Sequence, residues 1–458
     1  MESRTLKERF VMNKNDVFEI EITGMTDEGD GVGRAEGIAV FVPYTIVGEV
    51  VRVHIIKVNK SYAIGKLLDV VRPSEHRLKS ECEYFYKCGG CQLWHMDYEA
   101  ELEFKHQKVA DCIKRIGGID VPVSPVIGAD NLCRYRNKVQ LPVSEKGIGF
   151  YRKNSHDVID MDDCLLQTEE SRELVAIIRE WISEYNIEPY DEKTDKGVLR
   201  HIYIRSGREG ILLTLVSKEE KLPFADKLAE KLKESDIPVV GLVLNINSKP
   251  TNVVLGNKNI VLYGKGSLSD NIGDVEFEIS PNSFYQVNKE QTYKLYSTAL
   301  KMAELHGGET VWDLYCGIGT IGQFMAKSAA KIAGIEIVPQ AVADGERNAR
   351  KNEIYNAEYF CGAAEKLAPE LIKKGYKPDV VILDPPRKGC DEKLLETVVR
   401  SKPKRIVYVS CKPSTLARDL KYLEEKGYKT TEIVPCDMFP RTSHVETVVL
   451  LERTVSAI

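Results

Sequence analysis

The first part of the chain alternates apolar and polar residues in short runs. Between residues 16 and 72 about five such runs fall within fewer than sixty residues, separated by glycine-rich segments. A period of two is typical of half-buried strands. The clearest strands are expected at Val17–Ile22, Ile38–Val42, Glu49–Ile56 and Tyr62–Leu68, with the glycine-rich Gly29–Arg34 as a turn. Short strands at this density predict a small closed barrel of the OB type.

The last part of the chain, from about residue 271, alternates apolar runs with amphipathic helical segments. The run Arg405–Val409 predicts a buried strand, followed by a helix with Ser414 as N-cap that continues to about Lys426. This order is typical of an open α/β sheet of Rossmann type, where ligands gather at the carboxyl ends of strands. Cys411 falls at such an end. We expect the helix N-terminus and Lys412 to lower the pKa of its thiol; the alternative is a buried, inert cysteine.

A glycine-rich turn follows the strand Thr310–Leu314. Gly317 and Gly319 let a ligand approach the backbone just before a helix N-terminus. The next strand ends at Glu336, a position where an acid typically binds the ribose hydroxyls of an adenosine cofactor. NAD and S-adenosylmethionine both fit these features. The lone Gly-x-Gly with Asp313 upstream resembles the first motif of methyltransferases, which favours S-adenosylmethionine.

A later strand, Pro378–Leu383, ends in a sequence that resembles the fourth motif of class I methyltransferases, Asp384-Pro385-Pro386-Arg387. Arg387 stands where enzymes that methylate exocyclic amines usually carry an aromatic residue, so amine methylation is disfavoured. Asp384 is expected at the reacting end of the cofactor pocket, or else as a cap of the turn. Ala363 occupies the position where an acid near the adenine is usual, so this part of the pattern is missing.

Three closely spaced cysteines and a distant fourth form a metal-ligand pattern. Cys82, Cys88 and Cys91 lie within ten residues, and Gly89-Gly90 lets the backbone fold tightly between the last two. Cys164 follows a polar loop and is the expected fourth ligand. The alternatives are Cys133 and Cys112, the latter within the helical pattern from Tyr98 to Ile116 and expected in the core. Four thiolates suit tetrahedral zinc or a [4Fe–4S] cluster, and the spacing does not separate the two.

The middle of the chain combines basic and aromatic residues with α+β signals. Arginine, lysine and tyrosine interleave between Asn131 and His156, a composition that suits looped or single-stranded RNA and also an ordinary charged sheet face. A chain of 458 residues predicts two to three domains. A net charge of −5 means that any RNA-binding surface is local. Without a membrane span or signal peptide pattern we expect a cytoplasmic monomer with no membrane partner.

Two long motifs carry a resemblance over nearly the whole chain. They are Ser410-Cys411-Lys412-Pro413-Ser414-Thr415-Leu416-Ala417-Arg418-Asp419 and Met438-Phe439-Pro440-Arg441-Thr442-Ser443-His444-Val445-Glu446. With the Cys-Gly-Gly-Cys element, they resemble bacterial 23S ribosomal RNA uracil-C5 methyltransferases, and the barrel resembles a TRAM domain. The resemblance implies a covalent reaction with Cys411 as nucleophile and Glu446 as base. It implies S-adenosylmethionine binding by Gln286, Tyr315, Glu336 and Asp384, and a [4Fe–4S] cluster on Cys82, Cys88, Cys91 and Cys164.

The expected architecture is a TRAM barrel over residues 9–73, a central α+β domain with the iron–sulfur cluster over 74–270, and a Rossmann-like class I methyltransferase domain over 271–458. Part of 93–124 is expected to pack on the last domain. The transfer RNA branch typically lacks barrel and cluster, so 23S rRNA is the preferred substrate and tRNA the alternative. A cytosine-C5 methyltransferase is disfavoured because no cysteine follows the proline of the fourth motif. A non-enzymatic RNA-binding iron–sulfur protein would leave Cys411 and Glu446 unexplained.

Overall fold

A computed structural model describes residues 12–249 and 253–454 of the protein. The chain divides into two compact units, which are described separately. The first comprises Met1–Lys105 with Arg441–Ser443, and the second comprises His106–Pro440 with His444–Ile458. No helix in the described ranges is both long and apolar enough to cross a membrane.

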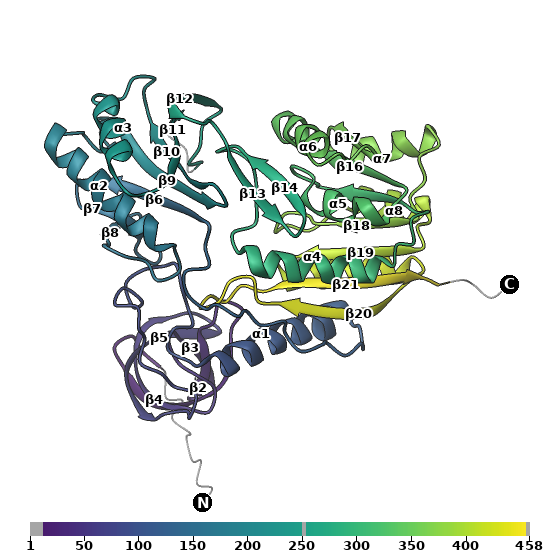
Figure 1. Cartoon of the computed structure of the whole chain (residues 1–458). Helices are drawn as coiled ribbons and strands as arrows, with labels where there is room; N and C mark the ends of the chain where they lie inside the picture. The colour runs from purple at the N-terminus through teal and green to yellow at the C-terminus, as the bar shows by residue number, and fades with distance from the viewer. Residues whose placement is uncertain (1–11, 250–252, 455–458) are drawn as a thin grey trace, which may run out of the picture. The chain divides into compact units, whose positions relative to one another are not determined.

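The first unit is built around a closed five-stranded barrel (Figure 1). Its spatial order is β1-β2-β3-β5-β4. Alternate side chains point inward and form an apolar core that includes Ile22, Val40 and Val53. The strands are β1 (Val17–Met25), β2 (Gly31–Ala35), β3 (Ile38–Val42), β4 (Val50–Val58) and β5 (Tyr62–Arg72). The predicted barrel is therefore confirmed.

The segment expected as a turn supplies one of these strands. β2 begins at Gly31 and pairs with both β1 and β3. A Cβ atom at Gly31 would lie 2.0 Å from the hydroxyl oxygen of Thr45, and one at Gly33 would lie 2.6 Å from the carbonyl oxygen of Glu21. The glycines are thus required by close approach within the barrel, and the turn prediction for Gly29–Arg34 was wrong for most of the segment.

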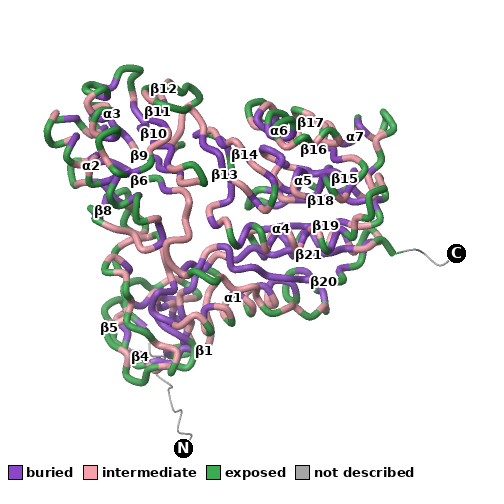
Figure 2. Tube along the Cα trace, viewed as in Figure 1, coloured by how far each residue is buried: buried purple, intermediate pink, exposed green. Residues whose placement is uncertain are grey.

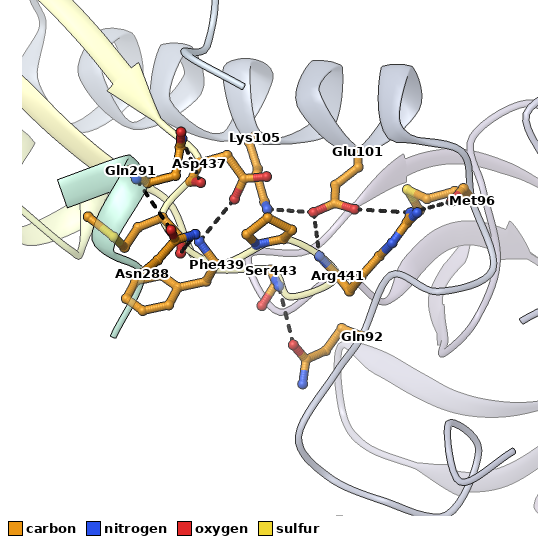
Figure 3. A network of polar contacts seen from close by, with 12 residues as sticks. Gln92, Met96, Glu101, Lys105, Asn288, Gln291, Asp437, Phe439, Arg441 and Ser443 are labelled. Atoms are coloured by element: carbon orange, nitrogen blue, oxygen red, sulfur yellow. Dashed lines mark hydrogen bonds and ion pairs between the residues drawn. The ribbon is translucent and has the colours of Figure 1, made fainter. Parts of the chain in front are cut away.

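A buried polar network ties Arg441–Ser443 to the rest of the first unit (Figure 3). The backbone N–H of Arg441 donates to Glu101 Oε1 at 2.7 Å, and the ammonium of Lys105 donates to the same oxygen at 2.6 Å. The guanidinium of Arg441 lies 5.0 Å from the ring centroid of Trp94. The side chains of Glu101 and Lys105 are fully buried. This pair sits on α1 (Tyr98–Cys112), which begins in the first unit and ends in the second.

The second unit contains a seven-stranded sheet backed by two helices. Its order is β12-β11-β10-β9-β6-β7-β8, and one face packs on α2 and α3 through Leu174, Trp181 and Leu228. The elements are β6 (Lys138–Ser144), β7 (Gly147–Tyr151), β8 (Val158–Asp160), α2 (Glu169–Tyr185), β9 (Leu199–Gly207), β10 (Gly210–Ser217), α3 (Ala225–Glu234), β11 (Val239–Ile246) and β12 (Lys258–Gly264). The hairpin of β13 (Leu268–Ile272) and β14 (Val275–Ile279) follows, and β13 spans the predicted boundary at residue 270.

A second seven-stranded sheet follows in the same unit, with the order β17-β16-β15-β18-β19-β21-β20. Its first five strands are parallel, and β21 is inserted antiparallel between β19 and β20. The strands are β15 (Thr310–Leu314), β16 (Lys331–Glu336), β17 (Ala357–Cys361), β18 (Val380–Leu383), β19 (Arg405–Ser410), β20 (Tyr428–Cys436) and β21 (Glu446–Arg453). The Rossmann-like sheet predicted from the sequence is confirmed.

Helices cover both faces of this sheet, and its central strands are buried throughout (Figures 1 and 2). They are α4 (Lys289–Ala303), α5 (Thr320–Met325), α6 (Pro339–Lys351), α7 (Ala364–Lys373), α8 (Glu392–Ser401) and α9 (Pro413–Glu425), with the short turn η2 (Ala326–Ser328) after α5. The π-helical turn η1 (Ile113–Gly117) continues α1 and packs on α9. Cys112 lies in the core beside it, as expected from its place in the helical pattern.

One ion pair with a fully buried carboxylate links the residue before β4 to the segment after β5. Glu49 is fully buried, accepts the N–H of Ile46 at 2.9 Å and pairs with the guanidinium of Arg77. Burial disfavours the charged carboxylate, but the hydrogen bonds from Arg77 and from backbone N–H groups outweigh it and lower the pKa of Glu49. The pair is thus held in its ionised form by contacts inside the barrel unit.

Glu49→Ala should destabilise the barrel by about 3 kcal/mol, because it leaves the Arg77 cation without its partner. Hydrogen exchange of the β1–β5 amides in the full chain measures this as faster opening. Asp69→Ala is the matched control: its pair with Arg52 is exposed, and the expected loss is below about 1 kcal/mol. Equal effects of the two substitutions would refute a structural role for the buried pair.

Candidate active site

The pairing of the second sheet brings four predicted site residues to one edge. Leu314 pairs with Ile335 on one side and with Leu383 on the other, and Leu383 pairs with Tyr408. Parallel strands share their carboxyl edge, so the residues that end these strands lie along it. They are Tyr315 after β15, Glu336 at the end of β16, Asp384 after β18 and Cys411 after β19.

Glu446 reaches the same edge because β21 runs in the opposite direction. Ser410 pairs with Thr447, so the next residues of the two strands, Cys411 and Glu446, stand opposite each other at the end of the ladder. Cys436 pairs with Glu446 from the other side. The strand register therefore places Glu446 at the same edge of the sheet as Cys411.

Cys411 lies between the end of β19 and the start of α9. The helix begins at Pro413 with Lys412 as N-cap residue, so Ser414 is inside the helix and the predicted N-cap was wrong. The hydroxyl of Ser410 accepts the N–H of Lys412 at 3.2 Å and shapes this short connection. Proline is favoured at the first helical position because its missing N–H has no partner there.

The thiol of Cys411 is held in its neutral form. The thiol is half-buried. Its pKa is raised to about 11, first by burial and then by the negative charges of Glu446 and Asp384. Arg387 acts in the opposite direction. The expected lowering of the pKa by Lys412 and the helix N-terminus was wrong, because desolvation and two neighbouring carboxylates outweigh these contributions.

Two carboxyl groups beside the thiol also have raised pKa values. Burial raises the pKa of Glu446 to about 8, with a further contribution from the charge of Asp384 and a lowering contribution from Arg387. Burial raises the pKa of Asp384 to about 7. A carboxyl group with a pKa near neutral can exchange a proton at physiological pH, which is the property of a general base or acid.

Arg387 is held near these groups by a network that sequence reasoning did not identify. Asp419 on α9 is buried and accepts the hydroxyl of Tyr408 at 2.6 Å and the N–H of Cys390 at 2.8 Å. Arg418 donates to the carbonyl of Lys388 at 3.0 Å. The turn after β18 is therefore fastened to the helix that follows Cys411. The signal was present, since Arg418-Asp419 ends the first long motif.

The glycine turn after β15 leaves room for a ligand. Gly317 has φ +56°, and a Cβ there would meet no atom within 4 Å. Its N–H donates to Glu336 Oε2 at 3.0 Å, and Val338 N–H donates to Glu336 Oε1 at 2.9 Å. Asp313 accepts Gly322 N–H at 2.8 Å, while its other carboxyl oxygen is buried without a hydrogen-bond partner. Open backbone, an acid at the strand end and an unsatisfied carboxylate fit an adenosine cofactor with a cationic centre.

The segment before α4 is fixed to the loop that leads to Glu446. Asn288 caps α4 and donates to the carbonyl of Met438 at 3.3 Å, and Gln291 donates to the carbonyl of Asp437 at 3.0 Å (Figure 3). The carbonyl of Gln286 accepts the side-chain amide of Asn137 at 3.0 Å. Gln286 is buried, and its segment therefore lies beside the β20–β21 loop at the same edge of the sheet.

The four predicted cluster ligands fall in different units. Cys82, Cys88 and Cys91 belong to the first, and Cys164 to the second. Burial raises the pKa of the Cys88 thiol, and the charge of Cys82 contributes in the same direction. Gly90 N–H donates to Cys88 Sγ at 3.3 Å, a contact that suits a thiolate ligand. In the described part of the chain no three His, Cys, Asp or Glu side chains are arranged as a metal site.

The electrostatics of Cys411 predict how fast it is alkylated. Glu446→Gln should lower the pH at which iodoacetamide half-maximally modifies Cys411, because it removes a charge that raises the thiol pKa, and Arg387→Gln should raise it. Peptide-level mass spectrometry measures the rate between pH 7 and 11. Lys412→Gln is the control and should change nothing. A large shift with Lys412→Gln and none with the other two would contradict this assignment.

Comparison with known families agrees with this geometry. The family described as tRNA (Uracil-5-)-methyltransferase matches residues 215–454, and the TRAM domain family matches residues 13–68. The chain is similar to the crystal structure of the Pyrococcus abyssi tRNA (uracil-54, C5)-methyltransferase in complex with S-adenosyl-L-homocysteine. The TM-score is 0.77 at 30% identity, covering 95% of this chain and 100% of that one.

Bacterial relatives match over nearly their whole length. A protein of Clostridium tetani described as an uncharacterized RNA methyltransferase is 49% identical, covering 97% of this chain and 98% of the relative. One of Halalkalibacterium halodurans with the same description is 46% identical, covering 97% and 99%. The barrel is thus a TRAM domain and the second sheet a class I methyltransferase fold. The chain belongs to the S-adenosylmethionine-dependent RNA uracil-5-methyltransferase family.

Proposed function

We propose that this enzyme methylates C5 of a looped or single-stranded uridine in 23S rRNA through a covalent bond between Cys411 and C6 of the base. The observation that carries the proposal is the register that sets Cys411 opposite Glu446, with Asp384 beside both. A nucleophile and a base with a pKa near neutral are what the chemistry of uracil C5 requires.

Uracil C5 is a weak carbon nucleophile until a nucleophile adds at C6. Cys411 reacts as the thiolate, after its proton has left to solvent, and its sulfur forms a bond to C6. The electron pair of the C5–C6 double bond moves toward the O4 carbonyl and gives an enolate. C5 of the enolate then forms a bond to the methyl carbon, while the bond between that carbon and the sulfonium sulfur of the donor breaks and its electron pair stays on the sulfur. S-adenosylmethionine, when bound, supplies this electrophilic methyl group.

The adduct must next lose the proton on C5. The carboxylate of Glu446 takes this proton, the C5–C6 double bond re-forms, and the bond between C6 and the Cys411 sulfur breaks with its electron pair returning to sulfur. A carboxyl group with a pKa of about 8 is a stronger base than an ordinary glutamate, so burial of Glu446 favours this transfer. Arg387 limits the rise in the pKa of Cys411 and of Glu446, because its positive charge favours the thiolate and the carboxylate.

Four side chains are assigned to the cofactor. Glu336 would bind the ribose hydroxyls; it ends β16 and accepts the N–H of Gly317. Asp384 would lie at the reacting end of the cofactor, and its charge acts on Cys411. Tyr315, with φ +66°, turns the chain between β15 and the glycine turn, and Gln286 lies on the segment before α4. Their support is the shared edge of the sheet and the family resemblance.

The proposal also includes a metal cluster bound by four cysteines. Cys82, Cys88, Cys91 and Cys164 would hold a [4Fe–4S] cluster, whose role is structural. The thiolate chemistry of the donors and the interaction between Cys82 and Cys88 fit such a group. Zinc on the same four thiolates is the alternative.

Protein isolated without exposure to air should contain about four iron atoms per chain and show the broad visible absorption of an iron–sulfur cluster. Cys88→Ser should lose the iron, while Cys361→Ser, at an exposed cysteine, should retain it. Iron and zinc are measured together by mass spectrometry of the metals. One zinc atom per chain and no iron would replace the cluster with a zinc site.

Transfer RNA is the second candidate substrate, and a specific observation favours it. The Pyrococcus abyssi enzyme is described as a tRNA methyltransferase, and its similarity to this protein covers 95% of this chain, which is more than the catalytic domain alone. A barrel together with this catalytic sheet is therefore compatible with a tRNA substrate, which weakens the barrel as an argument for 23S rRNA. The spacing of the cysteines and the resemblance to the ribosomal RNA enzymes support 23S rRNA.

Glu446→Gln should trap the covalent RNA adduct, because the methylated base keeps its C5 proton and the sulfur cannot leave. The expected turnover is about 10²- to 10⁴-fold lower than for the native enzyme, and the adduct appears on a denaturing gel. Cys411→Ala should abolish both turnover and adduct. Glu452→Gln, on the same strand, is the control and should behave as the native protein.

The native enzyme is given methyl-labelled S-adenosylmethionine and either unmodified 23S rRNA or unmodified tRNA, and nucleosides are identified by mass spectrometry. Labelled 5-methyluridine in 23S rRNA is the expected product. Label in tRNA alone changes the substrate and leaves the chemistry intact. Label in 5-methylcytidine, or no adduct with Glu446→Gln, would overturn the proposed roles of Cys411 and Glu446.

A further inference from the structure

The sheet formed by β6 to β12 in the second unit has one apolar face and one polar face. Its apolar face packs on α2 and α3 and includes Val139 and Ile204, which pair with each other across β6 and β9. The side chains of the neighbouring pairs point the other way, since successive residues of a strand alternate between faces. Those pairs are Lys138 with Arg205 and Gln140 with Tyr203.

This register places two cations directly opposite each other. Like charges at opposed positions of an antiparallel pair are destabilising. Neither Lys138 nor Arg205 has an ion-pair partner among the residues described by the structure. Burial, together with the charges of Arg205 and Arg136, lowers the pKa of Lys138 to about 8. Lys138 and Arg205 are therefore opposed with no carboxylate partner of their own among the described residues. The charge of Arg136 also acts on Lys138, so this part of the sheet offers a binding surface for an anion.

Arg205 is fixed before any ligand arrives. Its side chain is 3% exposed, its guanidinium donates to the carbonyl of Ser283, and it lies 5.4 Å from the ring centroid of Tyr203. Its Nε is buried and has no hydrogen-bond partner. Lys138 is half-buried, so the cluster is open to solvent on its side. A rigid cation behind an accessible one is a preorganised arrangement for an oxyanion.

The cluster adjoins the two segments that flank the candidate active site. The guanidinium of Arg136 lies 5.8 Å from the ring centroid of Phe439, in the loop that leads to Glu446. Its backbone forms a bridge with Asn288, which caps α4. Ser283, the partner of Arg205, belongs to the same segment before α4. An anion at this cluster would therefore lie beside the loops that position the base.

We propose that Arg136, Lys138 and Arg205 form a site for a backbone phosphodiester of the substrate RNA next to the target uridine. The inference rests on the proposed function, because an RNA substrate brings phosphates on both sides of the reacting base. Arginine and lysine are the usual partners of such phosphates. The carboxylate of S-adenosylmethionine is an anion of similar chemistry, and the test separates the two sources.

Lys138→Gln should weaken binding of the RNA and reduce the slope of log affinity against log salt concentration by about 0.7, the contribution of one phosphate of single-stranded RNA. The KM for RNA should rise and kcat at saturating RNA should stay close to native. Lys138→Arg should retain most of the affinity. Lys146→Gln is the matched control, because Lys146 lies on the β6–β7 turn, is exposed and pairs with Asp157.

Fluorescence anisotropy of the full-length protein with labelled 23S rRNA fragments and labelled tRNA measures these slopes, and S-adenosylmethionine binding is measured by calorimetry. The melting temperature of Lys138→Gln should equal or exceed that of the native chain, because the substitution removes a repulsive pair. A native salt slope for Lys138→Gln, or weaker S-adenosylmethionine binding with native RNA affinity, would overturn the phosphate site. Native protein that binds and methylates neither RNA would instead refute the proposed function on which the site rests.

Discussion

The antiparallel insertion of β21 between β19 and β20 is the constraint on which the candidate active site depends. It brings the start of one strand to the end of another, and so sets Cys411 opposite Glu446 although 35 residues separate them in the chain. Strand register has a period of two, and a slip by one residue would send Glu446 to the opposite face. The spacing between Cys411 and Glu446, the proposed nucleophile and base, is therefore set by backbone hydrogen bonds within the sheet.

The same edge carries an unfavourable concentration of negative charge. Asp313, Asp384 and Glu446 all have raised pKa values because burial removes water from their carboxyl groups. A site made only to be stable would not hold three such groups, since each is costly to ionise there. Asp419, by contrast, is buried with three donors around it and fastens the turn that carries Arg387. Stabilising contacts thus surround the edge, whereas the three carboxyl groups along it remain costly to ionise.

Much of this arrangement could be predicted from the sequence because it depends on local patterns. Alternation in the first part of the chain predicted the barrel, and the apolar runs ending at Glu336, Leu383 and Ser410 predicted which residues share an edge. The errors have physical causes. Gly31 and Gly33 belong to a strand because the barrel brings other atoms too close for a side chain, which no local pattern reveals.

The electrostatics of Cys411 could not be predicted for a similar reason. A sequence shows the helix and the lysine beside the thiol, but the two carboxylates that raise its pKa arrive from β18 and β21. The like-charged pair of Lys138 and Arg205 could not be predicted from the sequence either. The two residues are 67 positions apart, and only the pairing of β6 with β9 places them opposite each other. Long-range strand pairing decides both cases, and it is set by the fold as a whole.

Two charge clusters of opposite sign therefore lie in the second unit, and each is unfavourable for the protein alone. The acidic one borders the glycine turn where a cationic sulfonium would lie, and a positive charge there would lower the pKa of Asp384, Glu446 and Cys411 together. The basic one, around Lys138, adjoins the loop that leads to Glu446 and suits a polyanion. The two reactants of an RNA methyltransferase carry these opposite charges. In the proposed reaction, binding of the reactant of complementary charge would recover the stability that the protein gives up at each cluster.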